Sequence, residues 1–395
     1  MSSIPKIRNI EGLLKNQLAP NEHVVDTKIT RLTVPGENFG SEMMSLVIEI
    51  RDDSAKTERT LYAAAKLIPE KEEVRELFDT QVTYKSEFQF YNSVGPTLDK
   101  FLKKNGFPEG ADFIAPLYGG RLNLDGSDRV DEDAVILMAN LKVLGYSTGD
   151  KFKGLDISRA QVALRALAKF HAAGIGYRHQ NPESFEENFR PYFYYFIGDH
   201  LHEVVFDNLL PVLKSGGFSA KEMETVTSVY QGIAKKKDVS EIWGTLIHYD
   251  TWLNNILIKH EGSEPKQAVL VDYQVFEYGT PLNDVMLFLF TSIQLDVLKK
   301  EIDNLLDYYF NSLVENLGKL GLDISKFSRD SFNEEVAVAV KKYEYHHTMW
   351  MLVPILSRDL ESETAVKPGT ILHWSDEHKD RIKLITRLCL KKGWF

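Results

Sequence analysis

The stretch that decides the fold lies at residues 245–273 and reads TLIHYDTWLNNILIKHEGSEPKQAVLVDY. NILI and AVLVDY are two β-type runs in this stretch, and the polar segment between them contains glycine and proline. Two such runs around a polar turn predict a β-hairpin. Pairing the runs about Ser263 and Glu264 places Asn255, at the start of the first run, opposite Asp272, at the end of the second. We therefore expect two oxygen-bearing side chains to meet at one end of a rigid ribbon.

Asp250 adds a third oxygen-bearing side chain, because it lies five residues before Asn255 in the loop that leads into the hairpin. Carboxylate and amide oxygens suit a hard cation such as Mg²⁺, which takes a few protein ligands together with water and substrate phosphates. An aspartate that contacts the substrate hydroxyl instead can orient it and accept its proton during attack on the γ-phosphoryl group of ATP. Each residue alone is more typical of a turn or a strand-end cap. The spacing H-x-D-x-x-x-x-N from His248, followed by a strand-ending aspartate, matches the protein-kinase-like pattern and predicts phosphoryl transfer.

The segments HYDTWLNNILI and VLVDYQVFEYGTPLNDVMLFLF make the match more specific. They resemble the ecdysteroid kinase-like family, relatives of choline kinases and aminoglycoside phosphotransferases, whose usual pattern is close to HGD-x-W-x-x-N, then VDFQ and a Pro-x-x-Asp helix start. The resemblance runs over most of the chain. It implies Asp250 as the catalytic aspartate, Asn255 and Asp272 as Mg²⁺ ligands, and Asp284 as a structural brace for the catalytic loop.

The chain departs from the family pattern next to the catalytic aspartate. Tyr249 stands where the family usually has glycine, which puts a bulky ring beside Asp250 and is expected to narrow the acceptor site. Tyr273 replaces phenylalanine, a conservative change. We expect His248 to be a structural hydrogen-bonding residue and Trp252 to pack the loop.

A nucleotide site also requires a phosphate-binding lysine and a carboxylate that holds it. Lys66 lies in the strand-like run LYAAAKLIPE, where a long cation is costly to bury without a partner. Glu87 lies in YKSEFQFYNSV, which reads as a helix with Glu87 inside its apolar arc. An edge-exposed lysine and a solvated glutamate are the alternatives. A Lys66–Glu87 ion pair is what a kinase fold uses, and both positions match the family pattern.

Two further segments are predicted to contact the nucleotide. Gly36 and Gly40 lie in a turn before a strand, where backbone N–H groups would cover the triphosphate, although a plain hairpin turn has the same sequence signature. The run AVILMANLKVLGY resembles the family's strand-to-linker segment, whose backbone hydrogen-bonds adenine near Ala139 and Leu141. The family commonly has an acidic pair where this chain has Ala139 and Asn140.

Length and composition bound the fold class. The 395 residues, 43% hydrophobic and 26% charged, are enough for two lobes of an ordinary globular protein. We predict an α+β, two-lobed protein-kinase-like fold, with a small β-rich N-lobe at residues 1–140 and a larger, mainly helical C-lobe at residues 141–395. Strand-like runs are expected at residues 45–50, 61–68 and 134–138, and helices at residues 156–173 (stopped by Gly174), 191–213, 219–236, 284–317 and 333–356.

Charge and cysteine content narrow the partners. The formal net charge of −10 argues against a nucleic-acid partner, and no apolar run reaches the roughly 20 residues that a membrane span requires. The one cysteine, Cys389, rules out an intrachain disulfide, and with no signal-peptide pattern we expect a cytoplasmic protein. No obligate protein partner is evident.

The sequence thus predicts an ATP- and Mg²⁺-dependent kinase that phosphorylates a small-molecule hydroxyl. An apolar acceptor such as an ecdysteroid or other steroid is favoured by the family resemblance. The alternatives are a choline- or aminoglycoside-type kinase with a polar acceptor, and a catalytically weak nucleotide-binding pseudokinase. A protein kinase is less favoured, since HRD and APE-like segments are absent.

Overall fold

The computed structural model describes residues 4–33, 40–194, 200–232, 239–356, 372 and 374–395. Its strands are β1 Glu22–Arg31, β2 Glu42–Asp52, β3 Thr57–Leu67, β4 Leu117–Arg121, β5 Val135–Ala139, β6 Tyr146–Ser147, β7 Thr245–Ile247, β8 Ile256–Glu261, β9 Glu264–Leu270 and β10 Glu277–Gly279. Its α-helices are α1 Ile10–Leu13, α2 Glu72–Leu77, α3 Thr80–Gln89, α4 Gly95–Lys104, α5 Ile157–Gln180, α6 Pro182–Asn188, α7 His200–Ser215, α8 Ala220–Gln231, α9 Pro281–Ser292, α10 Leu295–Lys319, α11 Arg329–Ala339, α12 Tyr345–Leu356 and α13 Asp376–Lys392. Single π-helical turns, η1 Phe90–Val94 and η5 Val340–Glu344, join α3 to α4 and α11 to α12.

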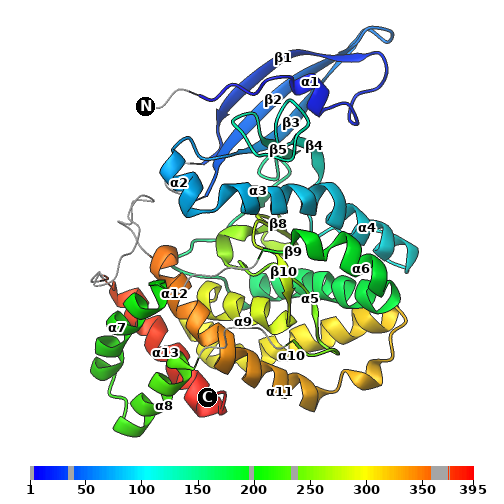
Figure 1. The fold of residues 1–395 in the computed structure, drawn as a ribbon. Helices are drawn as coiled ribbons and strands as arrows, with labels where there is room; N and C mark the ends of the chain where they lie inside the picture. The colour runs from blue at the N-terminus through cyan, green and yellow to red at the C-terminus, as the bar shows by residue number, and fades with distance from the viewer. Residues whose placement is uncertain (1–3, 34–39, 195–199, 233–238, 357–371, 373) are drawn as a thin grey trace.

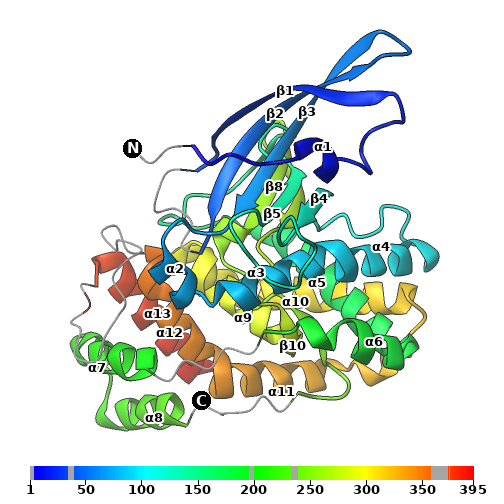
Figure 2. The same cartoon turned by 45° about the horizontal axis from the view of Figure 1, so that its top comes forward.

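The N-terminal part is built on an antiparallel sheet with the strand order β1-β2-β3-β5-β4. Strand β2 alternates in burial, with Met44, Leu46, Ile48 and Ile50 on the covered face, as expected of a strand with one face in a core. Helix α1 packs on this face and supplies Leu13 and Leu14. Figures 1 and 2 show the sheet standing above α3 and α4, which separate it from the helical part. The three strand-like runs predicted from sequence are confirmed.

The C-terminal part is mainly helical, with α5 in contact with α10, β7 and β9 (Figure 1). Its hydrophobic core extends into α3, η1 and α4, so these N-terminal helices pack on the C-terminal part as well as under the sheet. The predicted α+β class, with a β-rich N-terminal part and a larger helical part, is confirmed. In the part of the chain that the structure describes, no helix is both long and apolar enough to cross a membrane.

Two predicted helices are wrong in their bounds. The helix predicted at residues 284–317 is two helices, α9 and α10, because the chain turns extended at Ile293 to pair with Leu155. The helix predicted at residues 191–213 begins instead at His200, after a short 3-10 turn, with residues 195–199 outside the described part. The other predicted helices lie close to α5, α8 and the α11–α12 pair, although residues 233–238 are not described.

Helix α5 also corrects the prediction that Gly174 stops it. The helix begins as expected, with Asp156 accepting a hydrogen bond from the backbone N–H of Arg159 at 2.9 Å, but it continues to Gln180. At Gly174 the helix lies directly against β7: an added Cβ atom would contact the Thr245 hydroxyl and lie 2.9 Å from the Leu246 nitrogen. Glycine at this position therefore permits close packing within a continuing helix.

This packing predicts that Gly174→Ala destabilises the protein even though alanine favours helices. We expect a loss of about 1–3 kcal/mol in the free energy of unfolding, because the added methyl group overpacks the α5–β7 contact. Gly318→Ala on α10 is the matched control, since its Cβ would meet the nearest atom, on Ile324, at an ordinary 3.5 Å, and we expect it to gain up to about 1 kcal/mol. Urea unfolding of both variants checks this. Equal stability of the two would contradict it.

Candidate active site

The β8–β9 hairpin forms, but its register differs by one residue from the prediction. Glu261 pairs with Glu264, and a bulge after Lys259 shifts the rest of the ladder. Asn255 therefore lies opposite Val271, whose N–H donates to the Asn255 carbonyl at 3.0 Å, and not opposite Asp272. The pairing predicted from the sequence placed the turn one residue too late. Nothing in the local sequence indicates the bulge.

Asn255 faces Asp250 rather than Asp272. Its side-chain Nδ2 donates to the backbone carbonyl of Asp250 at 2.9 Å and to the Asp250 Oδ2 at 2.8 Å. These bonds connect the two ends of the segment at residues 250–255 and fix the direction of the Asp250 carboxylate. Residues 248–255, between β7 and β8, form the loop that we call the catalytic loop. The Oδ1 atom of Asn255 has no such bond within the described ranges.

Lys66 makes two ion pairs, one with helix α3 and one with Asp272 after the hairpin. Its Nζ atom lies 2.5 Å from the Glu87 Oε2 and 2.7 Å from the Asp272 Oδ1. Lys66 and Glu87 are both buried, at 3% and 1% exposure, and the Tyr84 hydroxyl donates to the Lys66 carbonyl at 2.8 Å. The structure therefore brings together Lys66 and Glu87 as the sequence predicted, and adds Asp272 as a second partner of the lysine.

Burial and charge shift the pKa values of these groups. Burial works against the charge of Lys66, but the carboxylates of Asp272 and Glu87 outweigh it and raise the pKa of Lys66. Burial raises the pKa of Glu87, and the positive charge of Lys66 opposes this shift. Burial and the nearby Asp272 raise the pKa of Asp250 to about 7, against the hydrogen bond from Asn255. A carboxylate with a pKa near the working pH is suited to exchanging a proton with a substrate.

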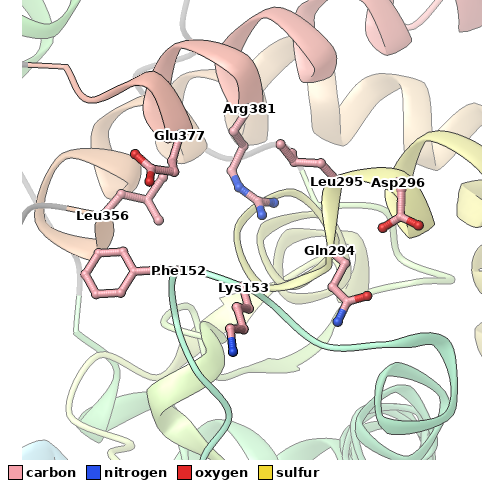
Figure 3. Close-up of a pocket in the computed structure, with 8 residues that line it drawn as sticks. All are labelled: Phe152, Lys153, Gln294, Leu295, Asp296, Leu356, Glu377 and Arg381. Carbon is pink, nitrogen blue, oxygen red and sulfur yellow. The ribbon is translucent and has the colours of Figure 1, made fainter.

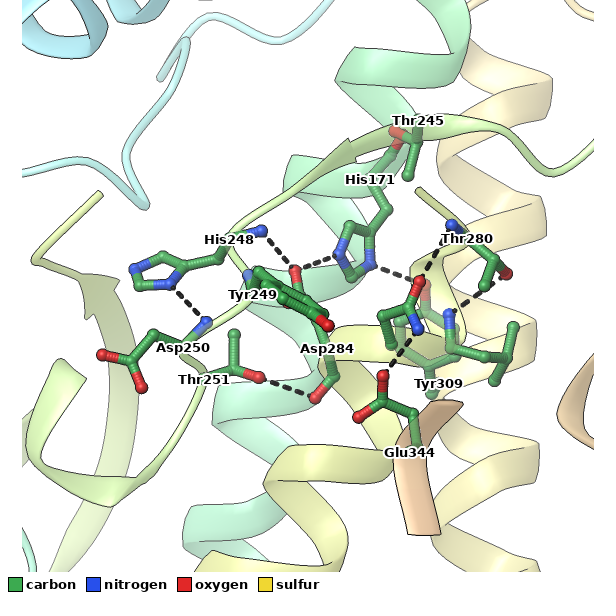
Figure 4. A network of polar contacts seen from close by, with 12 residues as sticks. His171, Thr245, His248, Tyr249, Asp250, Thr251, Thr280, Asp284, Tyr309 and Glu344 are labelled. Atoms are coloured by element: carbon green, nitrogen blue, oxygen red, sulfur yellow. Dashed lines mark hydrogen bonds and ion pairs between the residues drawn. The ribbon is translucent and has the colours of Figure 1, made fainter. Parts of the chain in front are cut away.

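Asp284 holds the backbone of the catalytic loop. Its two carboxylate oxygens accept hydrogen bonds from the backbone N–H groups of His248 and Tyr249, both at 2.7 Å, and its own carbonyl accepts from the Thr251 hydroxyl (Figure 4). Helix α9 presents this carboxylate from its first turn, after Pro281. The bracing role that the family resemblance implied for Asp284 agrees with these contacts.

His171 is a residue of this network that sequence reasoning missed. Its Nε2 lies 2.9 Å from the Asp284 Oδ2 and its Nδ1 lies 2.7 Å from the Tyr309 hydroxyl (Figure 4). These three side chains are almost completely buried. The available signal was a histidine on the otherwise apolar buried face of a helix, because a buried polar group requires a partner.

Both ring nitrogens of His248 form hydrogen bonds with backbone groups. Nε2 lies 2.8 Å from the Val271 carbonyl and Nδ1 accepts from the Asp250 N–H at 3.3 Å, while burial lowers the pKa of His248. Trp252 is buried and Tyr273 stacks on Phe90 at 3.6 Å between ring centroids. The expected structural roles of His248 and Trp252 are consistent with this packing.

Tyr249 has a strained backbone. Its φ is 63°, in the left-handed region that glycine adopts readily and that costs other residues about 1–2 kcal/mol. The family's usual glycine thus fits the backbone better than the tyrosine of this chain does. The hydrogen bond to Asp284 stabilises this conformation, and the tyrosine ring lies 4.5 Å from the ring of His347 on α12.

The two predicted nucleotide-contacting segments are described in part. Gly36 lies outside the described residues, and Gly40 lies near Phe78 and Gln274. In the linker, the Ala139 N–H donates to the Pro116 carbonyl and the Leu141 carbonyl accepts from the Tyr146 N–H. Within the described part, the Leu141 N–H makes no backbone hydrogen bond. Of the backbone N–H groups of Ala139 and Leu141, it is therefore the one that is open to a ligand.

A cavity of about 430 Å³ lies elsewhere in the helical part (Figure 3). It is lined by the loop after β6, the start of α10, the end of α12 and the first turns of α13. None of the predicted site residues lines it. Arg381 at this cavity donates to the carbonyls of Phe290 and Ile293, both at 2.8 Å, and so stabilises the end of α9. This cavity is therefore separate from the residues that are predicted to carry the chemistry.

The donor set at the catalytic loop fits a hard divalent cation. Glu87 and Asp272 both pair with the Lys66 cation, and the Asn255 Oδ1 and the second oxygen of Asp272 are left without hydrogen bonds within the described ranges. No set of three His, Cys, Asp or Glu side chains converges on a metal position among the described residues. Mg²⁺ held partly by substrate phosphates requires no such set.

The geometry defines a class of protein. Kinase-like phosphotransferases hold their phosphate-binding lysine by a glutamate from a helix and place it above a metal-binding aspartate. Lys66 on β3, Glu87 on α3 and Asp272, the second residue after β9, meet this requirement in three dimensions. We therefore assign the chain to the kinase-like phosphotransferases.

A comparison with protein-family models gives the family. The model of the ecdysteroid kinase-like family matches residues 35–322, well over half of the chain. The chain belongs to the ecdysteroid kinase-like family. No curated protein matches its sequence.

Several solved structures are similar to this chain at low identity. A choline kinase from Cryptosporidium parvum Iowa II has 8% identity and a TM-score of 0.43, over 93% of this chain and 91% of that chain. The streptomycin–ATP ternary complex of APH(2")-IIa has 14% identity and a TM-score of 0.33, over 77% and 84%. The GDP complex of wild-type aminoglycoside 2'-phosphotransferase-IIIa has 11% identity and a TM-score of 0.38, over 85% and 96%. The family assignment rests on the family model.

The Asp284 contacts predict that Asp284→Asn destabilises the protein by about 3 kcal/mol, because an amide N–H would then face a backbone N–H. Burial acts to raise the pKa of Asp284, but the hydrogen bonds from His171 and from the His248 backbone, with the electrostatic attraction of both residues, together outweigh it and lower the pKa. A carboxylate with a lowered pKa contributes stability above its ordinary pKa and loses it as the pH falls through the folded-state value. The difference between wild type and variant should therefore shrink below about pH 4.

Thermal and urea unfolding between neutral and acid pH measure this difference. Asp26→Asn on β1 is the control, because Asp26 is exposed and its substitution should change stability by less than about 0.5 kcal/mol. A variant at Asp284 as stable as this control at neutral pH would contradict the bracing role.

Proposed function

We propose that this protein transfers the γ-phosphoryl group of ATP to a hydroxyl group of a small molecule. The observation that carries this proposal is the contact of Lys66 with both Glu87 and Asp272, next to the Asp250–Asn255 loop. Burying a lysine and its two carboxylates costs desolvation free energy, so a purely structural role is a weak explanation for them. Neutralising substrate phosphates explains why a cation lies at this place.

ATP would bind between the N-terminal sheet and the catalytic loop. In this proposal Lys66 neutralises the negative charge on the phosphates, and Glu87 holds the lysine in place from α3. Gly36 and Gly40 would cover the triphosphate with backbone N–H groups, and the linker near Ala139 and Leu141 would bind adenine. The Leu141 N–H supports the last role, since it makes no backbone hydrogen bond in the described part of the chain.

Asn255 and Asp272 would hold Mg²⁺ through the oxygens that their other contacts leave available. When bound, the ion neutralises charge on the phosphates and fixes their orientation. Asp272 is ion-paired to Lys66, so the same residue links the nucleotide-binding lysine to the metal site.

Asp250 would orient the acceptor hydroxyl and accept its proton during in-line attack on the γ-phosphorus. Its carboxylate is oriented by Asn255, and its pKa of about 7 places proton exchange near physiological pH. Most of the rate enhancement would come from positioning and charge stabilisation, as is general for phosphoryl transfer.

The acceptor proposed first is an apolar alcohol such as an ecdysteroid or another steroid, which the family name supports. The alternatives are a choline- or aminoglycoside-type acceptor and a weakly active pseudokinase. An acceptor screen distinguishes both of them from a kinase that acts on an apolar alcohol. A cytoplasmic location is part of this proposal, since the single cysteine, Cys389, is free and buried.

Asp250→Asn tests the catalytic assignment. We expect transfer to fall by about 10³-fold or more, because the amide cannot accept the hydroxyl proton, while Mg-ATP still binds. Product formation by mass spectrometry, with hydroxylated steroids, choline and plant glycosides as acceptors, measures transfer, and calorimetry measures ATP binding. Full turnover by this variant would refute the role of Asp250.

Lys66→Met tests the nucleotide assignment. We expect kcat/KM for ATP to fall by about 10²-fold or more, because the charge that stabilises the phosphates is lost, with KM for the acceptor little changed. Lys28→Met, at an exposed position on β1, is the control and should leave both constants unchanged. A variant at Lys66 that kept the wild-type kcat/KM for ATP would show that the nucleotide binds elsewhere.

A further inference from the structure

The cavity between α10, α12 and α13 has the size of a small-molecule site (Figure 3). Its volume of about 430 Å³ lies within the range of roughly 300–1,000 Å³ that is typical of ligand pockets. Three apolar side chains, those of Phe152, Leu295 and Leu356, form part of its lining. The cavity can therefore take up the apolar body of a ligand and remove it from water.

Arg381 supplies a buried positive charge to the same cavity. The residue is 3% exposed, and Figure 3 shows its guanidinium group among the other side chains of the lining. Its two Nη atoms donate to the carbonyls of Phe290 and Ile293, and no other hydrogen bond of Arg381 occurs among the described residues. Because a guanidinium group has more N–H donors than these two, donors remain for a ligand.

No carboxylate in the described part of the chain forms an ion pair with Arg381. Burial lowers the pKa of Arg381 to about 10, with no carboxylate opposing the shift. The carbonyl groups at the end of α9 carry only a partial negative charge, equivalent to about half an elementary charge. Asp296, Glu377 and Lys153 also line the cavity, but all three are exposed, so water screens their charges. The cavity therefore combines apolar walls with a buried cation whose charge is only partly offset.

We propose that this cavity binds the anion of a small carboxylic acid with an apolar body. The carboxylate accepts charge-assisted hydrogen bonds from Arg381, and the apolar body packs on Phe152, Leu295 and Leu356. Such a ligand supplies the counter-charge that a buried arginine requires. A neutral ligand of the same shape lacks this charge, and a cationic one is repelled by the arginine.

This site is separate from the candidate nucleotide site. Arg381 holds the carbonyl end of α9, whereas Asp284, in the first turn of the same helix, holds the catalytic loop. Helix α9 has 12 residues, which corresponds to a length of about 18 Å. The carboxylate and Mg-ATP therefore bind at the same time, and the inference does not depend on the proposed kinase activity.

Calorimetric titration of the full-length protein with octanoate tests the inference. We expect a Kd of about 1 mM or lower for octanoate, and binding at least about tenfold weaker for octylammonium, which has the same chain and the opposite charge. Saturating Mg-ATP should change the Kd for octanoate by less than about twofold. Octylammonium binding as tight as that of octanoate, or displacement of octanoate by Mg-ATP, would overturn the inference.

Leu295→Trp fills the cavity and leaves Arg381 in place. We expect it to weaken octanoate binding about tenfold or more, because the space for the apolar body is lost. Leu124→Trp, at an exposed position after β4, is the matched control and should bind octanoate as the wild type does. Equal affinity of the two variants for octanoate would show that octanoate binds elsewhere.

Arg381→Met removes the charge and keeps an apolar side chain. We expect this variant to lose the preference for octanoate over octylammonium, and Arg381→Lys to retain part of it, because a cation remains. Thermal unfolding shows whether Arg381→Met folds, since it also loses the hydrogen bonds to the end of α9. If it does not fold, Leu295→Trp and the two ligands of opposite charge decide the matter. An unchanged preference in folded Arg381→Met would contradict the role of the arginine.

Discussion

The ion pairs of Lys66 with Glu87 and Asp272 are the interaction on which the rest of the structure depends. They connect Lys66 on strand β3 to helix α3, 21 residues along the chain, and to Asp272 after strand β9, 206 residues along. The two carboxylates offset the desolvation free energy of the buried lysine, so all three residues have to stay in contact. The N-terminal sheet and the catalytic hairpin are therefore fixed relative to one another at the point where phosphate chemistry is proposed.

A second buried charge organises the catalytic loop. Asp284 accepts from two successive backbone N–H groups and from His171, and so stabilises the loop before Asp250 in a conformation that is unfavourable for Tyr249. The same turn of α9 positions Asn283 toward Glu344 and, through it, His347. One helix start thus holds both the loop that leads to Asp250 and the buried Glu344.

Sequence reasoning succeeded where a residue type was improbable without a partner. Lys66 in an apolar strand and Glu87 inside an apolar helical arc each required the other, and the structure pairs them at 2.5 Å. It failed where the end of a helix or the register of a strand depended on packing against elements that are distant in sequence. Gly174 reads as a helix stop, but it is the place where α5 passes β7, and the break between α9 and α10 at Ile293 is set by pairing with Leu155. The hairpin register failed by one residue because a bulge leaves no local signal.

The sequence by itself determined the fold class and the family pattern, and it predicted the charged residues of the candidate site, because these follow from residue type and spacing. Only the tertiary structure decided which atoms those residues use. It directs Asn255 to Asp250, gives Lys66 a second carboxylate in Asp272, and brings His171 to Asp284. The physical reason is that spacing along the chain fixes which side chains lie in one element. The direction of a buried hydrogen bond is fixed by the packing of elements that are distant in sequence.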